Sequence, residues 1–163
     1  MSNRAALLCM LLSVGCITPG TETESEPSTL TQQFLRVTKE VPAFGGVTRE
    51  NGQWVVSLLD AAEHEAAEAR LRDIFQEEAA GIAVRVRAAQ GGASEQTKDA
   101  ATDVLSVPGV SRLDFDETTG YVRVGLVDVE AIEPAQVKLV ALGIPLDQVI
   151  LEVVRPSTPL YTL

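Results

Sequence analysis

Two stretches of this 163-residue chain repeat one pattern, and that repeat constrains the fold more than any other feature. Each stretch holds two apolar runs joined by a turn and ends at an aspartate, Asp60 in the first copy and Asp128 in the second. The turn of the first copy is Asn51-Gly52, and both residue types accept the positive φ of a two-residue hairpin turn. The repeat therefore predicts two similar units, each containing a β-hairpin.

A helix and a third strand are predicted after each of these aspartates. In the first copy, Asp60 and Glu63 have the spacing of a capping box, which indicates the start of a helix. Residues 82–88 alternate in polarity, as in a strand with one solvent-exposed face. In the second copy, Pro134 suits the first turn of a helix, and residues 149–154 supply the returning strand. Each copy therefore predicts strand, strand, helix and strand in that order.

The N-terminal segment has the features of a secretory signal peptide. Arg4 makes the start cationic, residues 5–14 form an apolar run, and a small residue, Gly15, precedes Cys16. The run is shorter than the ~20 residues that a helix needs to span a bilayer. The Gly15-Cys16 junction resembles the lipobox of bacterial lipoproteins, although Ser13 stands where that family usually has leucine. The resemblance implies cleavage before Cys16 and lipidation of its thiol, and an ordinary secretory cleavage is the alternative.

The segment after Cys16 predicts a disordered tether. Residues 17–31 are rich in Thr, Ser, Glu, Pro and Gly and contain no basic residue, so they have little apolar surface to bury. Cys9 lies in the signal segment, so a single cysteine remains and no intramolecular disulfide is expected. The chain carries 13 basic and 23 acidic side chains, and this net charge of −10 disfavours nucleic acid, whose phosphates need clustered cations.

The predicted fold class is α+β, with two repeated strand-strand-helix-strand units joined by a helix and forming one compact domain. Ser94 is the expected N-cap of the joining helix. One unit alone would bury little surface, so the two are expected to share an interface. The predicted segments, in chain order, are a signal peptide (1–15), the lipidated cysteine with its disordered tether (16–36), the first copy (37–92), a connecting helix (93–107), the second copy (108–155) and an extended tail (156–163).

The repeat also resembles the pro-regions of secreted serine proteases of the α-lytic protease and streptogrisin type. The resemblance covers roughly residues 41–155 and depends on the F-G-G sequence at Phe44, V-P-G-V at residues 107–110, D-x-D-x-x-x-G-x-V-x-V from Asp114 and L-G-I-P-x-D-x-V from Leu142. In that family the pro-region helps a following protease domain to fold, inhibits it and places its C-terminal tail in the active site. This sequence contains no protease domain after the repeat, so the resemblance implies a binding fold, with protease inhibition as one option.

The chemical inventory predicts no catalytic residue, metal or cofactor. His64 is the lone histidine, with Glu63 and Glu65 beside it and Glu68 one helical turn further. A zinc site needs three or four converging ligands, and only His64 and Glu68 share a helix face, so a solvated face is expected. No serine stands in a G-x-S-x-G elbow, which disfavours a serine triad.

Two further groups of residues have structural explanations. Asp114, Asp116 and Glu117 crowd one hairpin but lack the spacing of an EF-hand, so a charged turn is expected. Gly45-Gly46 lacks the surrounding motif of a phosphate loop, so the pair predicts a β-bulge or a close backbone approach.

One cluster of cations favours binding. Arg85 and Arg87 project from one face of the predicted third strand, and Arg70 and Arg72 lie on the neighbouring helix. Together they predict a surface for an acidic peptide or a carboxylate. Salt bridges to this protein's own acids are the alternative for these arginines.

The tail, residues 156–163, is a second candidate for binding, because Leu160 and Tyr161 would suit a protease cleft or the edge of a partner's sheet. A frayed terminus is the alternative. These features predict a non-catalytic, membrane-anchored lipoprotein of the bacterial cell envelope whose domain binds an envelope or secreted protein such as a protease. The alternatives are a small-molecule or metal-binding lipoprotein with a cleft between the two units, and a structural spacer.

Overall fold

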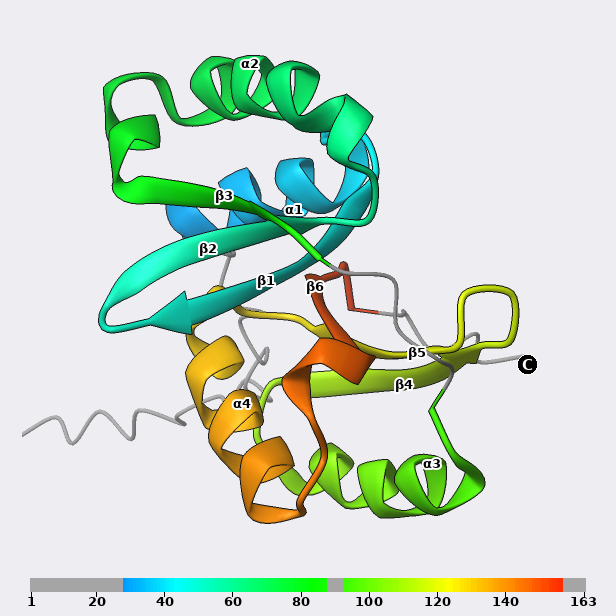
Figure 1. Cartoon of the computed structure of the whole chain (residues 1–163). Coiled ribbons are helices and arrows are strands. Elements are labelled where there is room, and N and C mark those ends of the chain that lie inside the picture. The colour runs from blue at the N-terminus through cyan, green and yellow to red at the C-terminus, as the bar shows by residue number, and fades with distance from the viewer. Residues whose placement is uncertain (1–27, 88–92, 157–163) are drawn as a thin grey trace, which may run out of the picture.

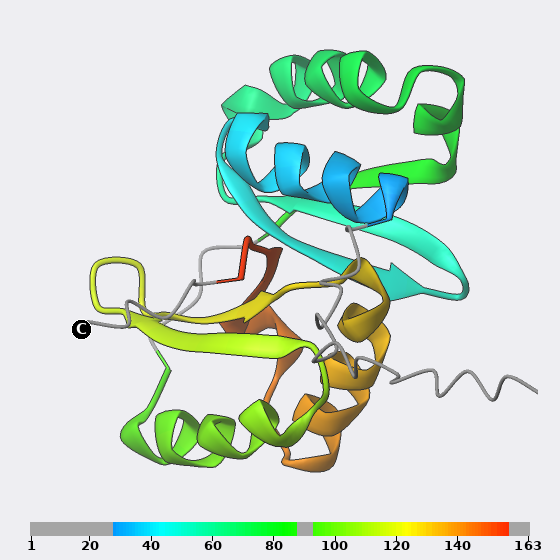
Figure 2. The ribbon, with the colours of Figure 1, turned by 180° about the vertical axis from the view of Figure 1, so that it is seen from behind.

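The computed structural model describes residues 28–87 and 93–156, which form two three-stranded sheets, each covered on one face by helices (Figures 1 and 2). We call residues 28–87 the first unit and residues 93–156 the second unit. The elements of the first unit are α1 (Thr29–Glu40), β1 (Phe44–Glu50), β2 (Gln53–Leu58), α2 (His64–Phe75) and β3 (Ile82–Val86). Those of the second unit are α3 (Glu95–Ala101), β4 (Val110–Asp116), β5 (Tyr121–Leu126), α4 (Ile132–Ala141) and β6 (Val149–Val153).

The two sheets share one topology. β1 and β2 form an antiparallel hairpin and β3 runs parallel to β2, and β4, β5 and β6 repeat this arrangement. A parallel strand needs a crossover connection, which α2 and α4 supply. The structure therefore confirms the predicted α+β class with two similar strand-strand-helix-strand units. Short 3₁₀ helices lie between these elements: η1 (Ala61–Glu63), η2 (Gln76–Gly81), η3 (Thr102–Ser106), η4 (Val129–Ala131) and η5 (Leu146–Gln148).

The repeat is longer than predicted, because a helix also precedes each hairpin. α1 leads into the first hairpin through V-P-A at residues 41–43, and η3 leads into the second through V-P-G at residues 107–109. In both units the carbonyl of the third residue accepts a backbone hydrogen bond, from Leu59 at 2.8 Å and from Val127 at 2.9 Å. The segment predicted as a connecting helix, residues 93–107, is therefore the counterpart of α1.

The prediction of a disordered tether up to residue 36 is wrong for its last part, because α1 already begins after Ser28. The Ser28 hydroxyl accepts from the N–H of Thr31 at 3.1 Å and caps the helix. Phe34 and Val37 are fully buried, and Phe34 packs against aromatic rings of β2 and α2, with centroids 4.9 and 5.2 Å away. The average composition of the segment concealed this apolar face, whose residues are spaced among threonines and glutamines.

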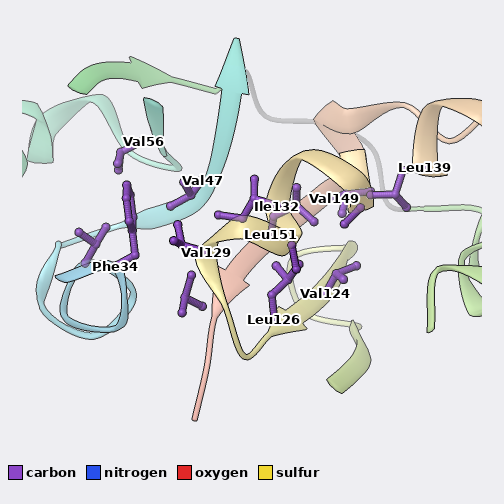
Figure 3. Packing of buried hydrophobic residues seen from close by; sticks show 14 of the residues in the cluster. Phe34, Val47, Val56, Val124, Leu126, Val129, Ile132, Leu139, Val149 and Leu151 are labelled. Carbon is purple, nitrogen blue, oxygen red and sulfur yellow. The ribbon is translucent and has the colours of Figure 1, made fainter. Parts of the chain in front are cut away.

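One hydrophobic core runs through both units (Figure 3). Val47 of β1, Val129 of η4, Ile132 of α4 and Leu151 of β6 are buried close together where the units meet. Because these side chains belong to one continuous cluster, the two units form the single compact domain that the repeat predicts.

A β-bulge interrupts the start of each hairpin. The pairing register shifts between Phe44 and Gly46 in β1, and at the matching place between Val110 and Arg112 in β4. Gly46 has a φ of +119°, and a Cβ atom on it would lie 3.3 Å from the backbone nitrogen of Leu151 in β6. A side chain here would be strained and would crowd the neighbouring backbone. The bulge and close approach predicted for this glycine pair are therefore confirmed.

Candidate functional site

At the junction of the two units, one side chain from each unit forms hydrogen bonds with backbone groups of the other unit. Gln136 of α4 accepts from the N–H of Arg49 in β1 at 2.8 Å and donates to the Arg49 carbonyl at 3.4 Å. In the other direction, Arg87 donates through Nη1 and Nη2 to the carbonyls of Val149 and Leu146, each at 2.7 Å. Backbone groups left unpaired away from water cost free energy, so both side chains stabilise the junction.

Arg87 lies in this junction, not on an exposed sheet face as predicted. Its guanidinium lies over the ring of Tyr121, 5.8 Å from the ring centroid. Burial lowers the pKa of Arg87 below its usual value, while Tyr121 and Asp147 act in the opposite direction. Because the guanidinium already donates to two backbone carbonyls, it is not available to receive an acidic peptide.

A second polar contact joins α1 to the second unit. The buried Thr31 donates through its hydroxyl to Asp128 Oδ1 at 2.9 Å and accepts from the N–H of Val129 at 3.2 Å. Asp128 also accepts from the N–H of Glu130 and so caps η4. The matching aspartate, Asp60, caps η1 in the same way. The repeated aspartate is thus a helix cap in both units and gains a contact across the junction in the second.

A groove of about 860 Å³ runs beside α1, where the first unit meets the end of β6. Its volume lies in the usual range for binding sites, roughly 300–1,000 Å³. The apolar residues that border it are Leu35, Val127, Val153, Val154 and Pro156. The charged residues that border it are Arg36, Lys39, Glu40 and Arg155. Buried side chains of the core fill the middle of the junction. The groove, and a smaller pocket of about 310 Å³ bordered by Arg49 of β1 and residues of α4, lie between the two units at its margins, where a cleft was the alternative expectation.

The charged residues of the groove are unequally neutralised. Glu40 accepts from Arg36 at 2.9 and 3.1 Å and lies 3.7 Å from Arg70 of α2. The hydrogen bonds from Arg36 hold the pKa of Glu40 below its usual value, with smaller effects from nearby cations. Lys39 and Arg155 have no ion-pair partner in the described part of the chain. Lys39 contributes only a small part of the lowering of the Glu40 pKa, and Glu40 is the single acid that borders the groove, so the groove carries an excess of positive charge beside its apolar residues.

The structure does not gather the four arginines predicted as one binding surface. Arg87 lies in the junction, and Arg85 forms a 2.9 Å ion pair with a glutamate of β1. Arg70 and Arg72 form ion pairs with acidic residues of α1 and α2. Arg72 borders a pocket with Ile82, whose side chain lies on the opposite face of β3 from that of Arg85. The alternative expectation of internal salt bridges therefore fits these three outer arginines.

The other predicted positions fall into two groups. Cys16, Leu160 and Tyr161 lie outside the described residues. His64 is partly exposed and its Nδ1 lies 3.9 Å from Glu68 Oε1, which fits the solvated helix face predicted there. Among the residues that the structure describes, no three His, Cys, Asp or Glu side chains are grouped as a metal site requires. In the same ranges, no helix combines the length and apolarity needed to cross a membrane.

The turn between β4 and β5 is the charged turn that was predicted, and it begins at Asp116, the last residue of β4. Asp116 Oδ1 accepts from the N–H groups of Thr118 and Thr119 at 3.0 and 3.1 Å. Arg123 donates to the other oxygen of the same carboxylate at 3.4 Å. Hydrogen bonds from Thr119 are the main reason why the pKa of Asp116 lies below its usual value. The carboxylate therefore holds the turn together.

Sequence reasoning missed α1, which borders the groove, and also Thr31 and Gln136, which hold the junction. A signal for α1 was present, because Ser28 stands three residues before Thr31 and the apolar Phe34 and Val37 follow at helical spacing. No such signal exists for Gln136. A glutamine in a helix bonds to whichever edge the fold brings to it, and that depends on contacts far apart in the sequence.

Comparison with known proteins adds no family. A scan against models of protein families finds no match, and a search of the curated proteins finds none. The function is therefore inferred from the groove, the junction and the sequence features.

Proposed function

We propose that this chain is a non-catalytic lipoprotein of the bacterial cell envelope that binds another protein through the groove beside α1. The groove itself carries the proposal: an apolar surface lies beside Lys39 and Arg155, which have no ion-pair partner in residues 28–87 and 93–156. The chain as a whole has a net charge of −10, so acids are abundant, but within the described ranges neither cation forms an ion pair with one, and Lys39 has only a small effect on the pKa of Glu40. A partner segment with both apolar and acidic side chains would match this surface.

The groove ends where the predicted binding tail begins. Pro156 borders the groove and is followed directly by residues 157–163, which include Leu160 and Tyr161. A tail that starts at the groove would lie near any partner bound there, and its apolar side chains would add to the same interface. Tail and groove are therefore proposed to act together.

Cys16 supplies the proposed membrane anchor, and the anchor would keep the groove near the membrane. α1 is the first described element and begins at Thr29, so residues 17–28 are all that separate Cys16 from it. A fully extended segment of this length spans about 40 Å, at 3.3–3.6 Å per residue. The proposed partner is therefore a protein of the envelope or one secreted through it.

Secreted serine proteases are the partner class that the pro-region resemblance names. The test mixes the purified chain with chymotrypsin-like proteases secreted by the source organism and measures complex formation by interferometry and protease activity by hydrolysis of a peptide substrate. We expect a complex that becomes about tenfold weaker when Lys39→Glu and Arg155→Glu are combined, because positive charge that attracts an acidic segment is reversed. Removal of residues 157–163 should weaken it further.

The matched control is Lys138→Glu on α4, because Lys138 is a cation outside the groove and should leave binding unchanged. A complex that the groove variant leaves intact would contradict the groove as the site. If no complex forms with these proteases or with other envelope proteins, the binding function itself is wrong. Mass spectrometry of the mature N-terminus tests the anchor separately, since an unmodified Cys16 or an intact Met1 excludes it.

A further inference from the structure

The outer edge of β3 differs from the other edges of the two sheets because nothing in the described residues blocks it. At the β1 edge, Gln136 bonds both free backbone groups of one residue. At the β6 edge, the carbonyl of Val149 accepts from Arg87. At the β4 edge, the carboxylate of Asp114 accepts from the N–H of Phe115 at 2.9 Å. Such contacts protect a strand edge from pairing with another strand, and β3 has none of them.

The pairing of β3 with β2 shows which backbone groups are free. The N–H of Arg87, directly after β3, donates to a β2 carbonyl at 2.8 Å. Backbone groups alternate in direction along a strand, so the odd-numbered residues of β3 face β2 and the even-numbered ones face outward. The N–H of Ile82 bonds the carbonyl of Ala79. The groups without a partner among the described residues are therefore the N–H and carbonyl of Val84 and Val86 and the carbonyl of Ile82.

The side chains of the same three residues lie on the face of the sheet that α2 covers. Val86 is 38% exposed and is one of few large apolar side chains on the described surface. Ile82 and Val84 border a pocket of about 360 Å³, together with Leu71 of α2. The same pocket is also bordered by Glu68, Arg72, Gln76 and Glu77 of α2 and the segment after it. The edge therefore combines hydrogen-bonding groups without a partner in the described residues, an exposed valine and the apolar side of a mixed pocket within one short strand.

We propose that two copies of the chain pair through their β3 edges, in antiparallel orientation and centred on Val84. In this register the two Val84 residues are directly opposite and exchange both of their outward hydrogen bonds. Val86 of each copy lies opposite Ile82 of the other, and its N–H donates to the free Ile82 carbonyl. The first sheets of the two copies then form one continuous sheet.

A second copy fits this edge because the edge is complementary to itself. The exposed Val86 of one copy lies beside Ile82 of the other, at the apolar side of the pocket, and so loses contact with water. Arg85, the only charged residue of the strand, lies opposite Ala83 of the other copy. Centring the pair on Arg85 would instead place two positive side chains directly opposite each other, which is destabilising.

The proposed contact is short, so we expect a reversible dimer. β3 has five residues, and stable interfaces usually bury about 1,200–2,000 Å² in total. The inference is independent of the proposed function, because the β3 pocket and the groove beside α1 share no bordering residue.

The test is sedimentation equilibrium of the full chain over a range of concentrations. Val84→Pro removes the outward N–H and leaves the bonds to β2, because this N–H faces away from β2. We expect the wild-type chain to show a monomer–dimer equilibrium and this variant to weaken it by about tenfold or more, since each copy loses a donor. Val86→Lys, which places a charge in the contact without changing the backbone, should weaken it as well.

The matched control is Val137→Lys on α4, which alters another exposed valine outside this edge and should leave the dimer unchanged. A wild-type chain that remains monomeric at about 1 mM would overturn the proposal. A dimer that survives both β3 substitutions would also overturn it. If Val84→Pro fails to fold by circular dichroism, Val86→Lys decides the question alone.

Discussion

The two units follow one plan but use opposite edges to meet each other. The first unit brings β1 to the junction, whereas the second brings β6. At the bulge, Gly46 of the first unit corresponds to Arg112 of the second. Gly46 lets the backbone of β6 approach, while Arg112 fills the matching place with a side chain that donates to Glu152 at 2.6 Å. A single residue at a repeated position thus decides which edge of a small sheet can become an interface.

The third strands of the two sheets, β3 and β6, also differ, because the charged residue of β6 is buried and that of β3 is exposed. Glu152 of β6 is buried and accepts from Arg112 and Arg123 at 2.6 and 3.1 Å. The matching Arg85 of β3 is exposed and pairs with Glu50. A buried carboxylate needs such partners, because its desolvation is costly without them. The charged cluster of the second sheet is therefore centred on a buried carboxylate, with Arg112 half-exposed at its outer side, whereas the charges of the first sheet lie at the surface next to an open edge.

The largest expected effect comes from a substitution in α1. It tests whether this helix is part of the core of the first unit, as its counterpart is part of the core of the second. Phe34→Ala should lower the free energy of unfolding by about 3–5 kcal/mol, because it leaves a cavity beside Phe75 and Trp54. Leu35→Ala, at the neighbouring groove-lining position, should lower it by about 1 kcal/mol. Urea denaturation of both variants measures the difference. Equal losses would mean that α1 is not part of the core.

The second prediction sharpens the difference between the two bulges. Gly46→Ala should lower the free energy of unfolding by about 2–3 kcal/mol, because the residue combines a positive φ with a close approach to β6. The matched control, Gly52→Ala, also has a positive φ but has open space around it, so about 1 kcal/mol is expected. If the two substitutions cost the same in denaturant titrations, the approach of β6 does not constrain Gly46.

The α+β class and the repeated hairpins were predictable because their signals are local. Asn51-Gly52 favours one turn geometry by itself, and the helix caps Asp60 and Asp128 act on the residues that follow them. The helix before the first hairpin was missed because a compositional average over residues 17–31 outweighed the helical spacing that begins near its end.

The candidate site could not be predicted in the same way. The groove forms between α1 and the end of β6, which lie at opposite ends of the described chain. Arg87 was expected on a solvent-exposed face of the sheet, because the alternation of residues along a strand indicates on which face each side chain lies. It does not report which other element covers that face. The predicted cluster of arginines was wrong for this reason. The groove could not be predicted because no local sequence pattern indicates it.

The third prediction breaks one contact across the junction. Gln136→Leu should lower the free energy of unfolding by about 1–3 kcal/mol, because the backbone N–H and carbonyl of Arg49 lose their partner. Hydrogen exchange should also become faster at the Arg49 amide. Gln96→Leu on α3 is the matched control, since Gln96 is exposed and should change stability by less than about 0.5 kcal/mol. Unchanged exchange at the Arg49 N–H would show that its hydrogen bond to Gln136 is not what protects this group from solvent.

The smallest expected effect separates the two hairpin turns. The first is closed by backbone preference, with φ values of +50° at Asn51 and +80° at Gly52, whereas the second depends on the Asp116 carboxylate. A carboxyl whose folded pKa lies below its unfolded value stabilises the fold at pH values above the unfolded pKa. That contribution is lost as the pH falls through the folded pKa. Asp116→Asn should therefore lower the midpoint temperature of thermal unfolding at pH 7 but not in strong acid.

Glu50→Gln is the matched control for Asp116→Asn, because Glu50 occupies the matching position before the first turn. Its carboxylate pairs with Arg85 at the surface and does not bond the turn's N–H groups, so a smaller fall in the midpoint is expected at pH 7. Thermal unfolding of both variants between pH 7 and strong acid measures the two differences. A larger loss for Glu50→Gln at pH 7 would mean that ion pairing across the sheet, rather than the carboxylate within the turn, distinguishes the two hairpins.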